Sequence, residues 1–185
     1  MSATHKIVFI GEPGAGKTTC IAAVSDIEPA CTDVECTDEL RLRKETTTVA
    51  LDYGELSLGD QGRLLLYGLP GQARFRFMYD VVRDGLLGAA VLVDASGGMV
   101  HGLKETLATY ADELRLLPCV VAINRCTDDV QAIRRQCLEL LYSHRIVAPV
   151  VVVDARRRED VVRIFELLFL QLEHSIVRET QGATT

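Results

Sequence analysis

Short runs of β-branched and other apolar residues alternate along the chain with amphipathic stretches of about 10 to 20 residues. This alternation is typical of parallel strands joined by crossover helices. It predicts strands over 6–10, 48–55, 62–67, 88–94, 118–123 and 148–153. It predicts helices over 17–25, 74–86, 100–116, 128–143 and 157–178. Continuous apolar runs at 89–93 and 119–123 indicate strands that are buried on both faces.

The segment 45–67 departs from this pattern because its two strands are joined by Gly59-Asp60-Gln61-Gly62, a turn sequence that predicts a β-hairpin. We therefore expect an α/β three-layer sandwich with about six strands, mostly parallel, one antiparallel edge strand and about five helices. Residues 26–44 are rich in acidic residues and have no regular period. They are predicted to form a mobile loop of the kind that often carries function.

Length and charge narrow the class of protein further. A chain of 185 residues suits one domain; we expect that domain over 1–180 and a short tail over 181–185. The net charge of −6 gives no global positive field for a nucleic-acid backbone, so nucleic acid is not expected as a partner. With no signal-peptide core, no apolar run of about 18 residues and no C-terminal prenylation cysteine, the protein is expected in the cytoplasm. A partner would have to recruit it to a membrane.

The six cysteines are scattered and include no C-x-x-C pair, so a zinc or redox site is not predicted. We interpret them as reduced thiols of a cytosolic protein. Cys31 and Cys36 are the only close pair, and ordinary loop residues are favoured over a functional thiol pair there.

The segment Gly11-Glu12-Pro13-Gly14-Ala15-Gly16-Lys17-Thr18 matches G-x-x-x-x-G-K-[ST] and lies between a predicted buried strand and a predicted helix. Glycines let backbone N–H groups turn inward around phosphates, and the helix N-terminus adds a positive dipole end. Lys17 is predicted to reach the β- and γ-phosphates, and the Thr18 hydroxyl to bind Mg²⁺. Thr19 follows directly and is included among the nucleotide-binding residues. The motif indicates a P-loop NTPase but leaves the base and the reaction open.

Further motifs make the chain resemble the Ras-like small GTPases, most closely the bacterial branch of gliding-motility polarity GTPases and actinobacterial conservon GTPases. They are Gly11 to Thr18, Thr46-Thr47-Thr48-Val49-Ala50-Leu51-Asp52-Tyr53-Gly54, Gly68-Leu69-Pro70-Gly71-Gln72 and Asn124-Arg125. The resemblance covers nearly the whole chain. It implies a molecular switch that binds GTP and GDP with Mg²⁺ and hydrolyses GTP slowly.

The resemblance assigns roles in two switch segments. Thr48 is implied as the Mg²⁺ ligand of the first switch, although Thr46 and Thr47 are adjacent alternatives. In the second switch, Gly71 is placed to offer its backbone N–H to a γ-phosphate, and Gln72 to orient the attacking water. Together with Lys17, these two residues form the predicted catalytic set.

Two positions depart from the family pattern. Gly68 stands where most small GTPases carry an aspartate that holds Mg²⁺ through water, so either metal affinity is lower or Asp52, on the paired strand, substitutes. Thr127 stands where the family's N-K-x-D motif has its guanine-reading aspartate. Either Asp128 replaces it by a one-residue shift, or guanine selectivity is weak, with an expected loss of about 1.5 to 3 kcal/mol.

The rest of the base site follows the resemblance more closely. Asn124 is implied to keep the loop contact of the motif asparagine, and the aliphatic stem of Arg125 to cover the base face. The segment Val153-Asp154-Ala155-Arg156 ends the last predicted strand where the family's final base-contacting loop lies, with the Ala155 N–H as the candidate donor.

No dependable arginine finger is found: Arg41, Arg43 and Arg74 are loop arginines, which are more often solvated than catalytic. Partner-accelerated hydrolysis is therefore expected. The resemblance implies a roadblock-type regulatory protein and a sensor-kinase-like protein as partners.

Two rival functions remain. A nucleotide-binding scaffold without turnover would fit Gly68 and Thr127, but it would have no need of Gln72. A small-molecule P-loop kinase would need an arginine-rich lid, and the only arginine cluster is Arg156-Arg157-Arg158 at the start of the last helix.

Overall fold

The computed structural model describes residues 3–34, 49–96, 100–127 and 129–182. Within them the strands are β1 (Thr4–Gly11), β2 (Ala30–Val34), β3 (Val49–Ser57), β4 (Arg63–Pro70), β5 (Leu86–Asp94), β6 (Cys119–Asn124) and β7 (Val150–Val153). The α-helices are α1 (Lys17–Val24), α2 (Phe77–Val82), α3 (Leu103–Leu116), α4 (Val130–Ser143) and α5 (Arg158–Gly182). Short 3₁₀ turns occupy Gly59–Gln61 and Ala73–Phe75.

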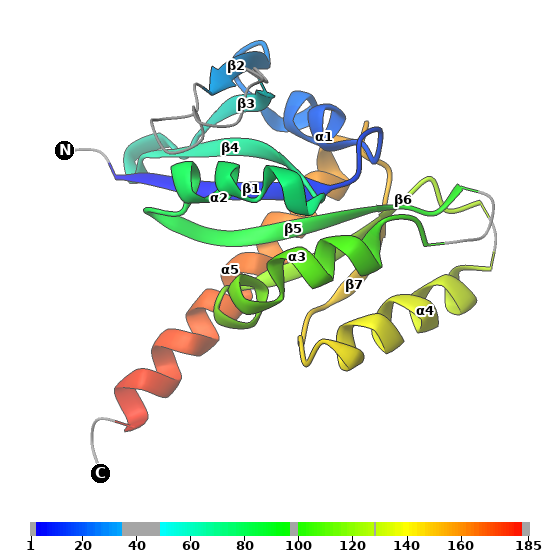
Figure 1. Cartoon of the computed structure of the whole chain (residues 1–185). Coiled ribbons are helices and arrows are strands. Elements are labelled where there is room, and N and C mark those ends of the chain that lie inside the picture. Colours follow the sequence, from blue (N-terminus) through cyan, green and yellow to red (C-terminus); the bar gives the residue numbers. More distant parts are fainter. Residues whose placement is uncertain (1–2, 35–48, 97–99, 128, 183–185) are drawn as a thin grey trace, which may run out of the picture.

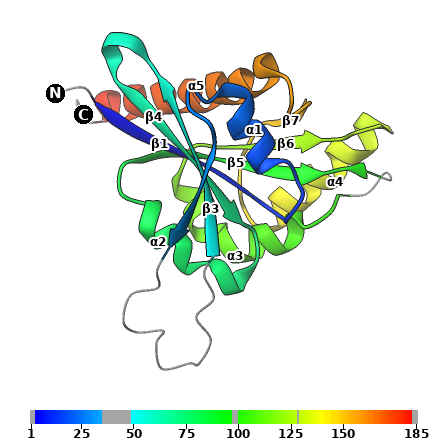
Figure 2. The ribbon, with the colours of Figure 1, turned by 90° about the horizontal axis from the view of Figure 1, so that it is seen from above.

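All seven of these strands form one sheet in the order β2-β3-β4-β1-β5-β6-β7. From β4 to β7 every neighbouring pair is parallel, whereas β3 is antiparallel to both β4 and β2. The predicted three-layer α/β sandwich with a mostly parallel sheet and an antiparallel hairpin is confirmed. Figure 2 shows the turn of that hairpin at the side of the sheet where the chain begins, away from α4.

One element differs from the sequence prediction. Residues 30–34, which lie within the segment expected to be a loop, form β2 and pair antiparallel with β3, with Ala30 opposite Tyr53. The hairpin strand β3 is therefore covered on its outer side and is not the edge of the sheet. Pairing of this kind satisfies backbone groups that an edge strand would expose. The rest of the predicted loop, 35–44, lies outside the described residues.

The core is divided by the sheet into two layers. Successive residues of β1 alternate between them: Val8 and Ile10 pack with α2, α3 and α4, whereas Ile7 and Phe9 pack with α1 and α5. Figure 1 shows these two helix layers on opposite faces of the sheet. Because the central strands are parallel and buried on both sides, their carboxyl ends and the loops that follow meet at one edge.

The last helix, α5, begins just after β7 and runs past the sheet, as Figure 1 shows. Its first half is anchored in the core by Val161, Ile164, Phe165 and Leu168, which are almost fully buried. Among the described helices, α5 included, none is both long and apolar enough to cross a bilayer.

Candidate functional site

The loop between β1 and α1 has the glycine-dependent geometry that the motif predicts. Gly14 and Gly16 have φ values of 83° and 110°, a left-handed conformation that other residues adopt only with strain. Gly11 requires glycine for another reason, since a Cβ there would lie 2.5 Å from the Leu92 carbonyl oxygen. The loop closes on itself through a hydrogen bond from the Ala15 N–H to the Glu12 carbonyl, at 3.1 Å.

The first turn of α1 presents free donors to this loop. Gly16 is the N-cap and contributes no side-chain hydrogen bond, and the earliest backbone bond of the helix runs from the Cys20 N–H to the Gly16 carbonyl at 2.8 Å. The N–H groups of residues 17–19 therefore have no partner within the helix. Pro13, Gly14, Thr18 and Thr19 are exposed around them. Such a terminus is suited to bind an anion.

Lys17 folds back over the loop. Its Nζ donates to the carbonyl oxygens of Gly11 at 3.0 Å and Glu12 at 2.8 Å. Burial lowers the pKa of this ammonium group, and the negative charges of Asp52 and Glu12 partly oppose that effect. The loop thus holds a partly desolvated cation at the place where phosphate charge would be neutralised.

Thr18 and Asp52 are joined across the site. The Thr18 Oγ1 donates to Asp52 Oδ2 at 2.7 Å, and Asp52 lies opposite Gly68 in the β3–β4 pairing. A Cβ at Gly68 would be 2.7 Å from that same Oδ2 and 2.8 Å from the Asp52 Cβ. The carboxylate on β3 therefore fills the space that a side chain on β4 would need.

The residues near Thr18 suit Mg²⁺ by their chemistry. A hydroxyl and a carboxylate oxygen at 2.7 Å from each other are hard donors of the type this ion prefers. The described residues contain no group of three or more His, Cys, Asp or Glu side chains that would enclose a metal by themselves. Mg²⁺ is commonly held by one or two protein oxygens together with substrate phosphates, which fits this arrangement. Thr48, the implied second ligand, lies outside the described residues, as do Thr46 and Thr47.

The segment predicted to be the second switch, 68–72, spans the end of β4 and is packed against α3. The Gly71 N–H donates to the Gly11 carbonyl at 2.9 Å, so in this conformation it is bonded to the phosphate loop itself. A Cβ at Gly71 would lie 2.2 Å from Thr106 Oγ1, which explains why glycine is needed. Next to it, the Tyr110 hydroxyl donates to the Pro70 carbonyl at 3.0 Å.

Gln72 begins the segment that leads into α2. Its Oε1 is buried and has no hydrogen-bond partner among the described residues. A buried carboxamide oxygen without a partner is costly unless another group satisfies it, and water bound in the site would do so.

Sequence reasoning missed Thr106 and Tyr110, the two α3 residues that hold this segment. Both are almost fully buried, although each carries a hydroxyl group. In the sequence, these residues are recognisable only as hydroxyl side chains on the apolar face of a predicted helix. That pattern does not show which segment the hydroxyl groups contact.

A pocket of about 630 Å³ lies beside the phosphate loop, at the carboxyl ends of β6 and β7. Its walls are formed by Thr19, Asn124, Arg125, Cys126, Thr127, Val152, Val153, Asp154, Ala155, Arg156 and Asp160. The structure therefore brings Asn124, Arg125, Asp154, Ala155 and Arg156, all predicted at a base site, to one cavity.

Asn124 connects this pocket to the phosphate loop. It is almost fully buried, its Nδ2 donates to the Ala15 carbonyl at 2.9 Å, and its Oδ1 accepts from the Ala155 N–H at 3.3 Å. A Cβ at Gly16 would meet the Asn124 Nδ2 at 2.6 Å, so the two loops touch. In this conformation the Ala155 N–H, the predicted base donor, is bonded to Asn124.

Arg125 adopts a left-handed backbone conformation with φ of 55°, and its Nη1 pairs with Asp94 Oδ2 at 2.5 Å. Burial opposes ionisation of Asp94, but hydrogen bonds from Ser96 and Arg125 outweigh it and lower the pKa of the carboxyl. The guanidinium is thereby tied to the end of β5. Asp94 is another site residue that the sequence did not indicate, because its contact with Arg125 is made between neighbouring strands.

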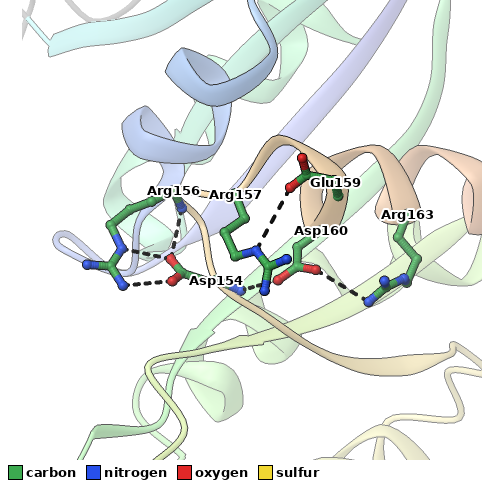
Figure 3. A network of polar contacts seen from close by, with 6 residues as sticks. All are labelled: Asp154, Arg156, Arg157, Glu159, Asp160 and Arg163. Atoms are coloured by element: carbon green, nitrogen blue, oxygen red, sulfur yellow. Dashed lines mark hydrogen bonds and ion pairs between the residues drawn. The ribbon is translucent and has the colours of Figure 1, made fainter.

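The part of the pocket lining that follows β7 carries a charged network, drawn in Figure 3. Arg156 binds Asp154 with both Nε and Nη2, at 2.9 and 2.7 Å, and the Asp154 N–H donates to Asp160 Oδ2 at 2.9 Å. Hydrogen bonds from Arg156 hold the pKa of Asp154 well below its usual range. Asp128, the predicted substitute for the motif aspartate, lies outside the described residues. Asp129 caps α4 by accepting from the N–H groups of residues 131 and 132.

Comparison with solved structures places this arrangement in a known fold. The chain matches the G domain of the T. maritima FeoB iron transporter with a TM-score of 0.58 and 18% identity, over 90% of this chain and 98% of that one. It matches S. thermophilus NFeoB bound to GDP (TM-score 0.54, 17% identity, 89% of this chain) and the cytosolic domain of L. pneumophila FeoB (0.54, 18%, 89%). It spans 60% and 63% of those two longer chains. The fold and the loops described above are those of the P-loop NTPase fold that these G domains share.

Sequence comparison gives the family. The chain is 30% identical over 120 residues to the uncharacterized protein MJ1339 of Methanocaldococcus jannaschii, a match that covers 65% of this chain and 69% of that protein. It belongs to the same family as that protein. None of the protein-family models matches the chain. The gliding-motility and conservon branch inferred from the motifs stays a prediction.

Proposed function

We propose that this protein is a GTP-binding molecular switch that hydrolyses GTP slowly to GDP and phosphate. The observation that carries the proposal is Asn124, whose side chain bonds both the phosphate loop at Ala15 and the pocket loop at Ala155. Phosphate cradle and base pocket thereby form one continuous site, as a nucleotide requires. The GDP bound to S. thermophilus NFeoB, a structural neighbour, supports guanine as the base.

Within this site the chain's own groups bind and orient the phosphates. The free N–H groups of the α1 N-terminus and the loop amides face the anion, and Lys17 exchanges its carbonyl contacts for phosphate oxygens. Thr18 and Asp52 would hold Mg²⁺, directly or through water, and Thr48 is the proposed additional ligand. When bound, Mg²⁺ neutralises charge on the β- and γ-phosphates.

The switch itself is proposed to be the Gly71 N–H. It is bonded to the Gly11 carbonyl here, and a γ-phosphate would compete for the same donor. Exchange of that bond would move the Pro70–Gln72 segment relative to α3, where Tyr110 and Thr106 contact it. A partner that reads this segment would distinguish GTP from GDP.

Gln72 is proposed to orient the attacking water through its unpartnered Oε1. The test is single-turnover GTP hydrolysis by wild type and Gln72→Leu, with nucleotide binding measured in parallel. We expect the variant to bind GTP normally and to hydrolyse it at least tenfold more slowly. Equal rates in the two proteins would support the scaffold function, in which nucleotide is held without turnover.

The base is tested by titrating nucleotide-free protein with GDP, GTP, ADP, ATP and xanthosine diphosphate in the presence of Mg²⁺. Tight, guanine-selective binding is expected. Binding that favours adenine, or that does not distinguish the bases, would overturn the GTPase assignment.

The arginine cluster 156–158 gives no support to a small-molecule kinase. Arg156 pairs with Asp154, Arg157 lies 3.9 Å from Glu159, and Arg158 donates to the Val24 carbonyl at 3.0 Å. All three arginines are thus engaged with neighbouring groups of the fold.

The motif resemblance extends the proposal to partners. A roadblock-type regulatory protein and a sensor-kinase-like protein would bind the two switch segments in the cytoplasm. Such a partner would also recruit the chain to a membrane. Co-purification with tagged protein loaded with GDP or a slowly hydrolysed GTP analogue tests this. Nucleotide-dependent capture of a roadblock-type protein is the expected result.

A further inference from the structure

The base pocket contains a carboxylate, Asp154, in the loop after β7, whereas the family motif places its carboxylate in the loop after β6. Thr127 follows β6 where the motif aspartate is expected, and both Thr127 and Asp154 line the same cavity. In the parallel β6–β7 pairing Asn124 lies beside Val153, so Asp154 begins the loop next to the loop that carries Thr127. The loop after β6 thus lacks the motif carboxylate, and the neighbouring loop after β7 carries one.

The present partner of Asp154 shows what its oxygens accept. The guanidinium of Arg156 donates Nε–H to Oδ1 at 2.9 Å and Nη2–H to Oδ2 at 2.7 Å, two parallel bonds shown in Figure 3. The Watson–Crick edge of guanine offers the same chemistry: the ring N1–H and the 2-amino N–H sit on two nitrogens that share one carbon, as in a guanidinium. Adenine has no such pair of donors on one edge.

Arg156 is held weakly enough to be displaced. Its side chain is 81% exposed, whereas that of Asp154 is 33% exposed. An exposed ion pair contributes little, because both charges are well solvated and the arginine loses rotamer freedom in it. The Asp154 backbone is fixed independently, since its N–H donates to Asp160 Oδ2 at 2.9 Å. Departure of the Arg156 guanidinium would free Oδ2 and leave Oδ1 with only the bond from the Arg156 backbone N–H, at 3.0 Å. Each oxygen would then keep a lone pair for a further donor without movement of the loop.

We propose that Asp154 is the guanine-reading residue of this protein, and that Arg156 occupies its carboxylate until the N1–H and 2-amino groups of guanine replace the guanidinium. This inference rests on the proposed function, because it names the specificity determinant of the same nucleotide site. The carboxylate is ionised at neutral pH, since Arg156 lowers its pKa. It can therefore act only as an acceptor, which matches the two guanine donors.

The test uses nucleoside diphosphates that share their phosphates and differ in the base: GDP, inosine diphosphate, which lacks the 2-amino group, xanthosine diphosphate, whose C2 carries an oxygen, and ADP. Wild type should bind GDP at least tenfold more tightly than inosine diphosphate. Asp154→Asn should lose about tenfold or more in GDP affinity and gain affinity for xanthosine diphosphate, because an amide can donate to the C2 oxygen. That gain is a readout that a misfolded variant cannot produce.

Asp129→Asn is the matched control. It removes one carboxylate from the loop after β6 but retains an acceptor for the α4 cap, so it should leave the order of affinities unchanged. Asp128→Asn tests the rival residue. If Asp128→Asn converted the preference to xanthosine diphosphate while Asp154→Asn kept guanine, the inference would be overturned and the GTPase proposal would stand. If Arg156→Ala, rather than Asp154→Asn, abolished guanine preference, the arginine would be the reader.

Failure of the proposed function looks different. Wild type would then show no preference between GDP and ADP, whichever variant is compared. A wild-type guanine preference that persists in Asp154→Asn contradicts only the role of Asp154.

Discussion

Thr18 on α1 donates its hydroxyl to the Oδ2 of Asp52 on β3, at 2.7 Å. The same Oδ2 lies 2.7 Å from where a Cβ of Gly68 would be. The Asp52 carboxylate therefore occupies the space that a side chain at position 68 would need. The pairing of Asp52 with Gly68 in the sheet brings the β3 carboxylate to the phosphate loop, at the place where the motif resemblance predicts a carboxylate from β4.

The first prediction tests a transfer of the carboxylate from position 52 to position 68. Asp52→Ala should reduce the effect of Mg²⁺ on GDP affinity by about tenfold, because a charged ligand is lost. Adding Gly68→Asp to that variant should restore the Mg²⁺ effect, since the new carboxylate enters the vacated space. GDP release measured with Mg²⁺ and with EDTA gives both values.

The single variant Gly68→Asp and the exposed Asp60→Ala complete that experiment. Gly68→Asp alone should destabilise the fold by about 1–3 kcal/mol, because its Cβ would lie 2.8 Å from that of Asp52. Asp60→Ala should leave the Mg²⁺ effect as in wild type. A double variant as insensitive to Mg²⁺ as Asp52→Ala would contradict the relocation of the carboxylate.

Local patterns were enough to predict most of the fold and the phosphate loop. Alternating apolar strands and amphipathic helices follow from spacing along the chain, and Gly14 and Gly16 mark left-handed positions that nearly any sequence would fill with glycine. Strand β2 was missed because it is stabilised by pairing with β3, about twenty residues away, rather than by a period of its own.

The contacts of the site were harder to predict than its residues. Tyr110 reaches the Pro70 carbonyl across 40 positions of sequence, and Arg125 reaches Asp94 across 31. Such contacts depend on which strands and helices become neighbours, and the sequence pattern does not fix the exact register. Motif residues such as Asn124 could be predicted from the sequence because the motif directly follows a recognisable strand.

A second prediction concerns the contact between Gly71 and Thr106. Gly71→Ala should distort the second switch, because its Cβ would lie 2.2 Å from Thr106 Oγ1. We expect a loss of about 1–3 kcal/mol in the free energy of unfolding and a fall in GTP hydrolysis. Thr106→Ala removes the clashing oxygen and should recover much of the stability in the double variant. Denaturant unfolding of the four proteins gives the coupling, and additive losses would show that the two sites do not interact.

A third prediction follows from the lowered pKa of Lys17, whose main cause is burial. Because the folded protein binds this proton less tightly than the unfolded chain, the unfolded chain holds more protons between the lowered pKa and the ordinary value of 10.5. The contribution of Lys17 to the free energy of unfolding therefore rises with pH in that window. In Lys17→Met this rise should be absent.

Denaturant unfolding of nucleotide-free wild type and Lys17→Met over this pH range tests the sign. The stability difference should shift in favour of wild type as the pH approaches 10.5. Lys104→Met, which removes an exposed positive charge from α3, controls for the change in net charge. A difference that is constant with pH, or that shifts toward Lys17→Met, would contradict the desolvated environment of Lys17.

The last prediction separates the structural and binding roles of Asn124. Asn124→Ala leaves the Ala15 carbonyl and the Ala155 N–H without their partner in a buried place, so it should cost about 1–3 kcal/mol of stability. It should also weaken nucleotide binding at least tenfold, because the phosphate loop and the pocket lose their connection. Gln171→Ala is the matched control: its Nε2 and Oε1 bond the backbone of Cys119, at the opposite end of β6. We expect both variants to lose stability, but only Asn124→Ala to lose nucleotide affinity. Equal nucleotide affinities in the two variants would mean that the two loops bind nucleotide independently of the Asn124 side chain.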